Sequence, residues 1–170
     1  MPRFPTLVLA AALVQPTLAG AETLTIEGVG IGRDLDCGGK DVGIYGAENA
    51  IVLTGRCGLI TVHGSKHTVS FEEGAAVAVS GADNRVTGGR TQDVTVSIAQ
   101  NSVTATLGGA GSPGTLDVSG AQNRVSLVLA GPTRFTVQGA DHAVEWMRSE
   151  GAPNPEVQAS GIKNTIKRKP

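Results

Sequence analysis

Apolar residues alternate with polar or small residues in short runs along most of this chain, and turns that contain glycine separate the runs. One unit has Val42 and Ile44 before its turn, and Ile51 and Leu53 after it. Alternation with a period of two predicts β-strands that direct one face toward a core. The pattern therefore predicts one short strand on each side of every turn.

The turns share a spelling: Gly, two residues that are mostly small or polar, Asn or His, a spacer, and a β-branched residue. Six copies begin at Gly46, Gly64, Gly81, Gly120, Gly139 and Gly161, and a seventh has Ile98 in the glycine position. The Asn or His positions are Asn49, His67, Asn84, Asn101, Asn123, His142 and Asn164, with spacings of 17 to 22 residues. Self-similarity at about twenty residues is typical of a solenoid.

Equivalent strands of successive coils run in the same direction, so stacking them forms parallel sheets around a thin core. The predicted fold class is all-β, a right-handed parallel β-helix (β-solenoid) of about seven short coils, with the hand expected of parallel crossovers. The two longest spacings place insertions at residues 108–114 and 148–155. Loops that bulge from a solenoid are frequent binding sites, although a tolerated surface loop is the plainer interpretation.

We expect a single domain over residues 22–170, with an N-terminal cap or degenerate opening coil at 22–36, repeats at 37–166 and a basic tail at 167–170. The chain has 170 residues, 24 glycines and only 3% aromatic residues, which fits a narrow core of small and β-branched side chains. Its formal net charge is −1, so the composition does not point to nucleic acid as a partner.

Residues 1–21 have the organisation of a signal peptide. Arg3 supplies a positive charge, Leu7 to Val14 an apolar run, and Ala19-Gly20-Ala21 a cleavage site of small residues. The apolar run is shorter than the ~20 residues of a membrane span, which disfavours the alternative of an uncleaved anchor. We expect an exported protein, periplasmic or extracellular, that does not span the membrane after cleavage.

The only two cysteines, Cys37 and Cys57, lie 20 residues apart, close to one repeat. An exported chain favours a disulfide between them, and it would join neighbouring coils. No second cysteine pair or histidine cluster accompanies them, so zinc or redox chemistry is not indicated.

The repeated Asn has the same parity as the apolar positions, so it should point inward. Stacked side-chain amides can then form a hydrogen-bonded ladder that also satisfies the backbone groups of the turns. His67 and His142 occupy the same column as substitutes that offer a donor and an acceptor. Four coils separate them, about 19 Å, so they cannot share a metal ion. We expect no metal and no cofactor.

Outward positions provide candidate binding surfaces. Tyr45, His63 and Trp146 are candidate surface-binding residues, although filling the wider final coil beside Phe135 is the plainer role for Trp146. One outward column contains Tyr45, His63, Ser80, Ser97, Ser119, Gln138 and Ser160; another contains Ser70, Thr87, Thr104 and Ser126 beside Arg85, Ser102 and Arg124. Such hydroxyl arrays could bind a sugar polymer or ice, but solvated strand faces have the same composition.

An enzyme that cleaves polysaccharides needs clustered carboxylates with a base in one groove. The candidates are Asp34, Asp36 and Asp41 with Lys40, and the pair Glu72-Glu73. Neighbouring residues on a strand face opposite ways, so the glutamate pair should not converge on one bond. No serine nucleophile motif or phosphate-binding glycine loop is present.

The cysteines flank a Gly-x-x-Asn turn in an ordered set of motifs: Cys37, Val42-Gly43-Ile44, Gly46-Ala47-Glu48-Asn49, Leu53-Thr54-Gly55, Cys57, Ile60-Thr61-Val62, Gly64-Ser65 and Val69. From Asp36 to Val144 the chain resembles the bacterial secreted proteins grouped as domain of unknown function 3060, although His67 replaces the expected Asn. The resemblance implies an exported short-repeat β protein and no known activity.

Three hypotheses follow. The first is an exported, non-catalytic structural or binding module of the cell envelope, with an envelope glycan or protein as its partner. The second is a polysaccharide-active enzyme that works near Asp34, Asp36 and Asp41. The third is ice or surface binding through the Thr and Ser columns.

Overall fold

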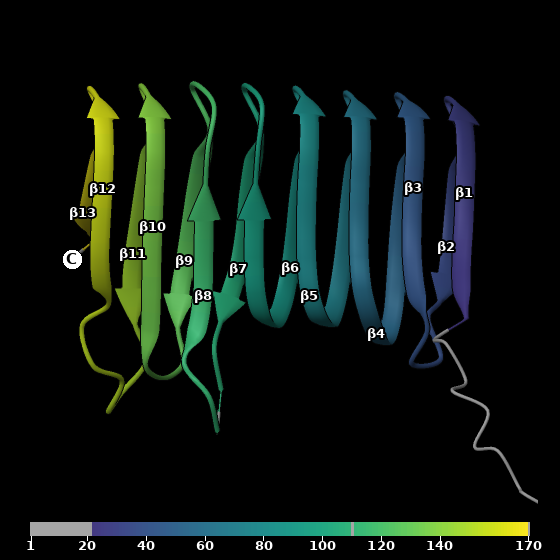
Figure 1. Cartoon of the computed structure of the whole chain (residues 1–170). Coiled ribbons are helices and arrows are strands. Elements are labelled where there is room, and N and C mark those ends of the chain that lie inside the picture. Colours follow the sequence, from purple (N-terminus) through teal and green to yellow (C-terminus); the bar gives the residue numbers. More distant parts are fainter. Residues whose placement is uncertain (1–21, 110, 170) are drawn as a thin grey trace, which may run out of the picture.

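The computed structural model describes residues 22–109 and 111–169, and it winds them into a rod of stacked coils (Figure 1). The predicted signal peptide lies outside these residues. The strands are β1 (Thr23–Val29), β2 (Gly32–Asp36), β3 (Asp41–Ala47), β4 (Ala50–Ser65), β5 (Thr68–Ala82), β6 (Arg85–Val96), β7 (Ser102–Leu107), β8 (Gly114–Val118), β9 (Arg124–Leu129), β10 (Thr133–Ala140), β11 (Ala143–Arg148), β12 (Glu156–Ile162) and β13 (Thr165–Arg168). The part of the chain that the structure describes contains no helix, and therefore no helix long and apolar enough to cross a membrane.

All the strands belong to one 13-stranded sheet, which β4, β5 and β6 carry around the lower bend so that it forms two layers. We call these layers the front sheet and the rear sheet. The front sheet contains β1, β3, β8, β10, β12 and the second halves of β4, β5 and β6; the rear sheet contains their first halves with β2, β7, β9, β11 and β13 (Figure 1). Every strand pairing is parallel and joins equivalent positions of neighbouring coils. The predicted parallel β-solenoid is therefore confirmed.

The solenoid has about eight coils, one more than the Asn and His positions predict. β1 pairs with β3 along its whole length, and β2 pairs with β4, so residues 23–36 form a complete opening coil. Ile31 precedes Gly32, the partner of Ala50, and so occupies the position that Asn49 has in the next coil. The absence of Asn hid this coil from the repeat count.

The core consists of apolar columns that follow the rod axis. One column contains Val42, Ile60, Val77, Val94, Leu116 and Phe135, which are paired from coil to coil and are all buried. Val157 continues this column in β12 but is 45% exposed, because no further coil covers it. Each coil thus buries the apolar face of its neighbour, as solenoids require.

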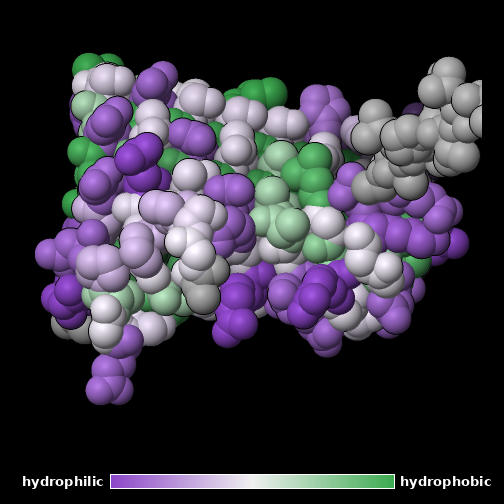
Figure 2. Space-filling view, turned by 60° about the horizontal axis from the view of Figure 1, so that its bottom comes forward, coloured by the Kyte–Doolittle hydropathy of each residue, from purple (hydrophilic) through white to green (hydrophobic). Residues whose placement is uncertain are grey.

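The insertions lie at the lower bends of the rod, between β7 and β8 and between β11 and β12 (Figure 1). Gln92 fixes the first one, because its side-chain amide donates to the carbonyl oxygen of Ser112 at 2.8 Å. Hydrophilic residues cover much of the surface near these bends, whereas residues of intermediate or apolar hydropathy gather over the middle of the rod (Figure 2).

Candidate functional site

The upper turns are tight because two residues in each adopt left-handed backbone. In the turn after His63, Gly64 has a φ of 135° and Lys66 a φ of 57°. A β-carbon on Gly64 would lie 2.0 Å from the carbonyl oxygen of Gly46 in the preceding coil. Glycine occupies this position in most turns because the backbones of stacked coils approach closely there, and Ile98 is the exception.

The predicted Asn column forms a buried ladder of hydrogen bonds. The backbone N–H of Asn101 donates to Oδ1 of Asn123 at 2.9 Å, and the same bond recurs along the column. The Asn101 amide also donates to the carbonyl oxygens of Ser97 and Gly81, each at 2.9 Å. Each Asn therefore links its own turn to the preceding coil and satisfies backbone groups that water cannot reach.

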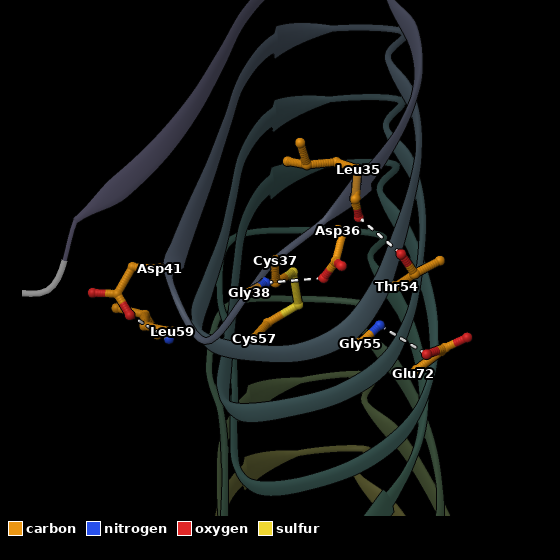
Figure 3. Close-up of a disulfide and its surroundings, with 10 residues drawn as sticks. All are labelled: Leu35, Asp36, Cys37, Gly38, Asp41, Thr54, Gly55, Cys57, Leu59 and Glu72. Carbon is orange, nitrogen blue, oxygen red and sulfur yellow. Dashed lines mark hydrogen bonds between the residues drawn. A yellow bond between two sulfur atoms is a disulfide. The ribbon is translucent and has the colours of Figure 1, made fainter.

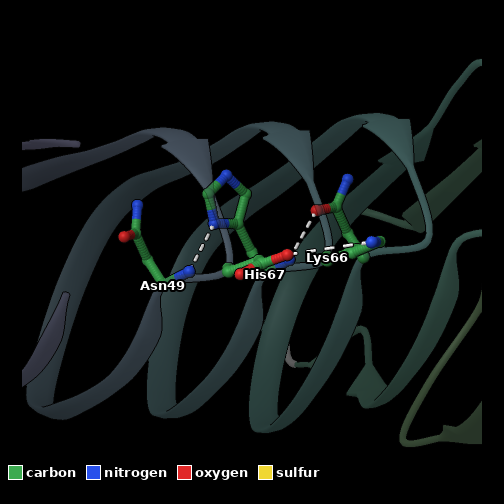
Figure 4. A network of polar contacts seen from close by, with 5 residues as sticks. Asn49, Lys66 and His67 are labelled. Atoms are coloured by element: carbon green, nitrogen blue, oxygen red, sulfur yellow. Dashed lines mark hydrogen bonds and ion pairs between the residues drawn. The ribbon is translucent and has the colours of Figure 1, made fainter. Parts of the chain in front are cut away.

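Histidine replaces asparagine as the acceptor at two places in this ladder, although Nε2 of His67 is buried without a hydrogen-bond partner within the described part of the chain. Nδ1 of His67 accepts from the backbone N–H of Asn49 at 3.2 Å (Figure 4). Nδ1 of His142 accepts likewise from Asn123, and its Nε2 lies 3.0 Å from the carbonyl oxygen of Gln138. An imidazole that accepts at Nδ1 and donates at Nε2 is the neutral form. Burial of the ring lowers the pKa of His67, which favours that form.

Cys37 and Cys57 form the disulfide that the sequence predicts. Their Cα atoms are 4.9 Å apart and both residues are buried at the lower bend (Figure 3). The bridge fastens the end of β2 to the bend within β4, where the register between β4 and β5 also shifts. It therefore holds the first coil against the second.

The carboxylates proposed for an enzyme do not converge. Asp36 and Asp41 lie on opposite sides of the disulfide (Figure 3). Asp36 accepts from the backbone N–H of Gly38 at 3.0 Å, and Asp41 from that of Leu59 at 2.7 Å. Asp34 is paired with Val52 on the rear sheet. The two carboxylates at the bend thus hold backbone, and the three aspartates define no common groove.

The two glutamates make different contacts, although both line one depression at the lower bend with Arg56. Glu72 accepts from the backbone N–H of Gly55 at 2.8 Å, whereas Glu73 lies 3.4 Å from the guanidinium of Arg56. Within residues 22–109 and 111–169, no three His, Cys, Asp or Glu side chains are grouped closely enough to hold a metal ion.

The candidate surface residues fall into two places. Tyr45 and His63 are neighbours on the front sheet, with ring centroids 6.3 Å apart, and Nδ1 of His63 lies 2.7 Å from the Ser80 hydroxyl. Trp146 belongs to β11 of the rear sheet, pairs with the buried Leu127 and packs partly against the core. The structure therefore does not bring Trp146 together with the other two.

Sequence reasoning missed a hollow on the rear sheet. Two adjoining depressions share Ser102, Arg124 and Ala143, and the larger has a volume of about 500 Å³. The remaining lining consists of Val103, Thr104, Val125, Ser126 and Glu145 on one side and Gln100, Asn101, Gln122 and Asp141 on the other. We call these two depressions the rear hollow. The outward column of Arg85, Ser102 and Arg124 can be read from the sequence. The hollow itself forms because the small side chains of Ser102 and Ala143 lie on either side of the long Arg124 side chain, and the sequence does not show this.

These features define the class: a two-sheet parallel β-solenoid with an internal Asn and His ladder. The family model described as protein of unknown function (DUF3060) matches residues 44–101, about a third of the chain. The chain thus contains a DUF3060 family domain in that range, which confirms the resemblance seen in the sequence. No curated protein and no solved structure matches the chain.

Proposed function

We propose that the protein is an exported, non-catalytic binding module of the cell envelope that presents a rigid sheet surface to an extended partner. The observation that carries this proposal is that buried and outward polar side chains have different roles. Most of the buried ones, such as Asn101, belong to the ladder, whereas the outward ones lie in columns along the two parallel sheets. A periodic surface on a rod suits a periodic ligand.

Rigidity supports binding, because a surface that is ordered in advance loses little entropy when its ligand arrives. The Cys37–Cys57 disulfide fixes the first two coils, and the ladder links successive coils as far as Asn164. Disulfides persist mainly in oxidising compartments, so the bridge also supports export.

The second candidate, a polysaccharide-cleaving enzyme, has weaker support. General acid and base catalysis requires two groups that reach one bond. Asp36 and Asp41 instead lie on opposite sides of the disulfide, and each accepts a backbone N–H (Figure 3).

Purified protein of residues 22–170 tests the proposal on a glycan array and in pull-downs from envelope fractions. We expect retention on a polysaccharide without release of shorter products. Turnover of any bound polysaccharide would overturn the non-catalytic assignment. In that case, loss of turnover on replacement of Asp34, Asp36 and Asp41 by Ala would assign the activity to the alternative site. Thermal hysteresis in the same preparation would favour ice binding.

A further inference from the structure

We propose that the rear hollow and the adjoining Arg85 bind the carboxylate groups of an acidic polysaccharide. Arg124 in the hollow and Arg85 beside it are the anion-binding side chains, with Ser102 between them. This inference rests on the proposed function and deepens it, because it names the surface and the chemical class of the ligand.

The two arginines lie in one outward column of the rear sheet. Arg85 pairs with Ser102, and Ser102 with Arg124, so the arginines occupy alternate coils of the stack. Strand spacing places their backbones about 10 Å apart along the rod. The short side chain of Ser102 leaves the space between them open, and its hydroxyl can donate to an anion held there.

Both guanidinium groups are available. Among the residues that the structure describes, neither Arg85 nor Arg124 forms an ion pair or a side-chain hydrogen bond, and both are exposed. Arginine presents a planar fork of donors that matches a carboxylate in a bidentate manner. Two unpaired forks that flank a hydroxyl form an arrangement suited to oxyanions.

The surroundings favour a hydroxyl-bearing polymer. Thr104 and Ser126 continue the surface as a hydroxyl column, and Gln100 and Gln122 add amides at the upper edge. Hydroxyls and amides both donate and accept, which suits the many hydroxyl groups of a sugar chain. The flanking coils also repeat the same strand geometry, so successive residues of a polymer meet equivalent positions.

Two acidic residues line the hollow. Asp141 belongs to the larger depression, where it offsets part of the positive charge of Arg124. Glu145 belongs to the other depression, where lysines offset its charge. Glu145 is paired with Lys169 at 2.7 Å and with Lys167 at 3.1 Å. Their hydrogen bonds and charges lower the pKa of Glu145 and hold it ionised within a cluster of net positive charge. The Glu145 edge of the hollow therefore attracts anions.

The same lining disfavours single-stranded nucleic acid. Proteins that bind single strands stack the bases on aromatic side chains. No aromatic residue lines either depression of the rear hollow, and the whole chain has a formal net charge of −1.

The test measures binding of alginate oligomers, which carry carboxylates, by calorimetry at physiological salt. Dextran sulfate, neutral dextran and oligothymidylate serve as comparison ligands. We expect alginate to bind, neutral dextran and oligothymidylate not to bind, and dextran sulfate to bind more weakly. Arg85→Gln and Arg124→Gln should each weaken alginate binding about tenfold, since each removes a charge-assisted contact.

Two further variants separate the site from general electrostatics. Ala143→Leu fills the shared part of the hollow without a change of charge and should also abolish binding. Arg90→Gln, on the lower bend, removes one positive charge elsewhere and should leave the affinity unchanged. An Arg90→Gln variant as weak as Arg124→Gln, or equal binding of oligothymidylate, would overturn the inference.

The failures of the two proposals remain distinguishable. Binding only to neutral glycans, or alginate binding that survives both arginine substitutions, refutes this site and leaves the binding module standing. Absence of binding to every glycan and envelope fraction refutes both.

Discussion

The backbone N–H of Asn49 donates to the ring nitrogen Nδ1 of His67 in the next coil, at 3.2 Å. In the described chain, only one further step of this ladder, from Asn123 to His142, has a histidine as its acceptor. In all the remaining steps the acceptor is the Oδ1 of an asparagine. An amide oxygen accepts at any physiological pH, whereas a protonated imidazole has a second N–H at Nδ1 and no longer accepts. His67 therefore makes its step of the ladder dependent on pH.

We predict that acidification destabilises the protein partly through His67. Burial lowers its pKa in the folded state below the ordinary histidine value of 6.5, so the unfolded chain takes up the proton first. The stabilising contribution is thus fully present above about pH 6.5 and is lost as the pH falls toward the lower folded value. Urea unfolding at pH 7.5 and pH 5.5 measures this loss.

His67→Asn is the matched variant, because it restores the residue found in most coils. Its oxygen can accept from Asn49 at either pH, so we expect a smaller decrease in the free energy of unfolding on acidification. An unchanged decrease would contradict the prediction.

Removal of one ladder asparagine should destabilise the rod according to its depth. In Asn101→Ala, the N–H of Asn84 and the carbonyl oxygens of Gly81 and Ser97 lose buried partners. Unsatisfied buried groups cost about 1–3 kcal/mol each, so we expect a loss of about 3–5 kcal/mol.

Asn164→Ala makes the same chemical change in the last coil, where Asn164 is only partly buried. Water can replace its contacts there, so we expect a loss of about 1 kcal/mol. Chemical denaturation of both variants checks the difference, and equal losses would show that the ladder bonds do not depend on burial.

The strand pattern was predictable because the core is periodic. Alternation around each glycine gives the inward positions directly, and residues such as Val62 and Val94 are buried as expected. The opening coil was not counted because Ile31 replaces its asparagine and removes the clearest marker of the repeat. Predicted inward residues of the last coil, such as Val157, are exposed because burial depends on a following coil.

The candidate site was less predictable for a physical reason. The sequence shows which residues point outward, but not which ones leave space. The rear hollow arises where Ser102 and Ala143 stand on either side of Arg124, and such relief depends on side chains from three coils. Likewise, parity alone does not show that Asp36 and Asp41 each hold a backbone N–H.

Ile98 provides a prediction of increased stability. It occupies the glycine position of its turn with a φ of 73°, and its side chain is 53% exposed. Left-handed backbone is unfavourable for a β-branched residue, with a cost of about 1–2 kcal/mol. Ile98→Gly removes this strain, although glycine loses more backbone entropy on folding, by about 0.5–1 kcal/mol. We expect a net gain of up to about 1 kcal/mol in urea unfolding, and a loss would show that the Ile98 side chain contributes packing.

The two ends of the rod carry arginines in positions that are apolar in the coils between them. Arg33 pairs with the buried Ile51, and Arg168 with Trp146, which itself pairs with the buried Leu127. Strand edges that end in inward-directed charge resist the addition of another strand. The terminal coils also leave side chains of the core columns partly uncovered: Val157 is 45% exposed, and Leu24, Leu35 and Ile166 are only partly buried.

We therefore predict that the double variant Arg33→Ile and Arg168→Ile assembles end to end. A contact between unlike ends does not close on itself, so the products should be rods of increasing length. Sedimentation velocity and electron microscopy would detect them, with Arg90→Ile on the lower bend as a control for lost charge. A double variant that sediments like the wild-type protein at the same concentration would show that the arginines do not protect the ends. The lack of a side-chain acceptor at Ile31 would then be enough to prevent another coil from continuing the ladder.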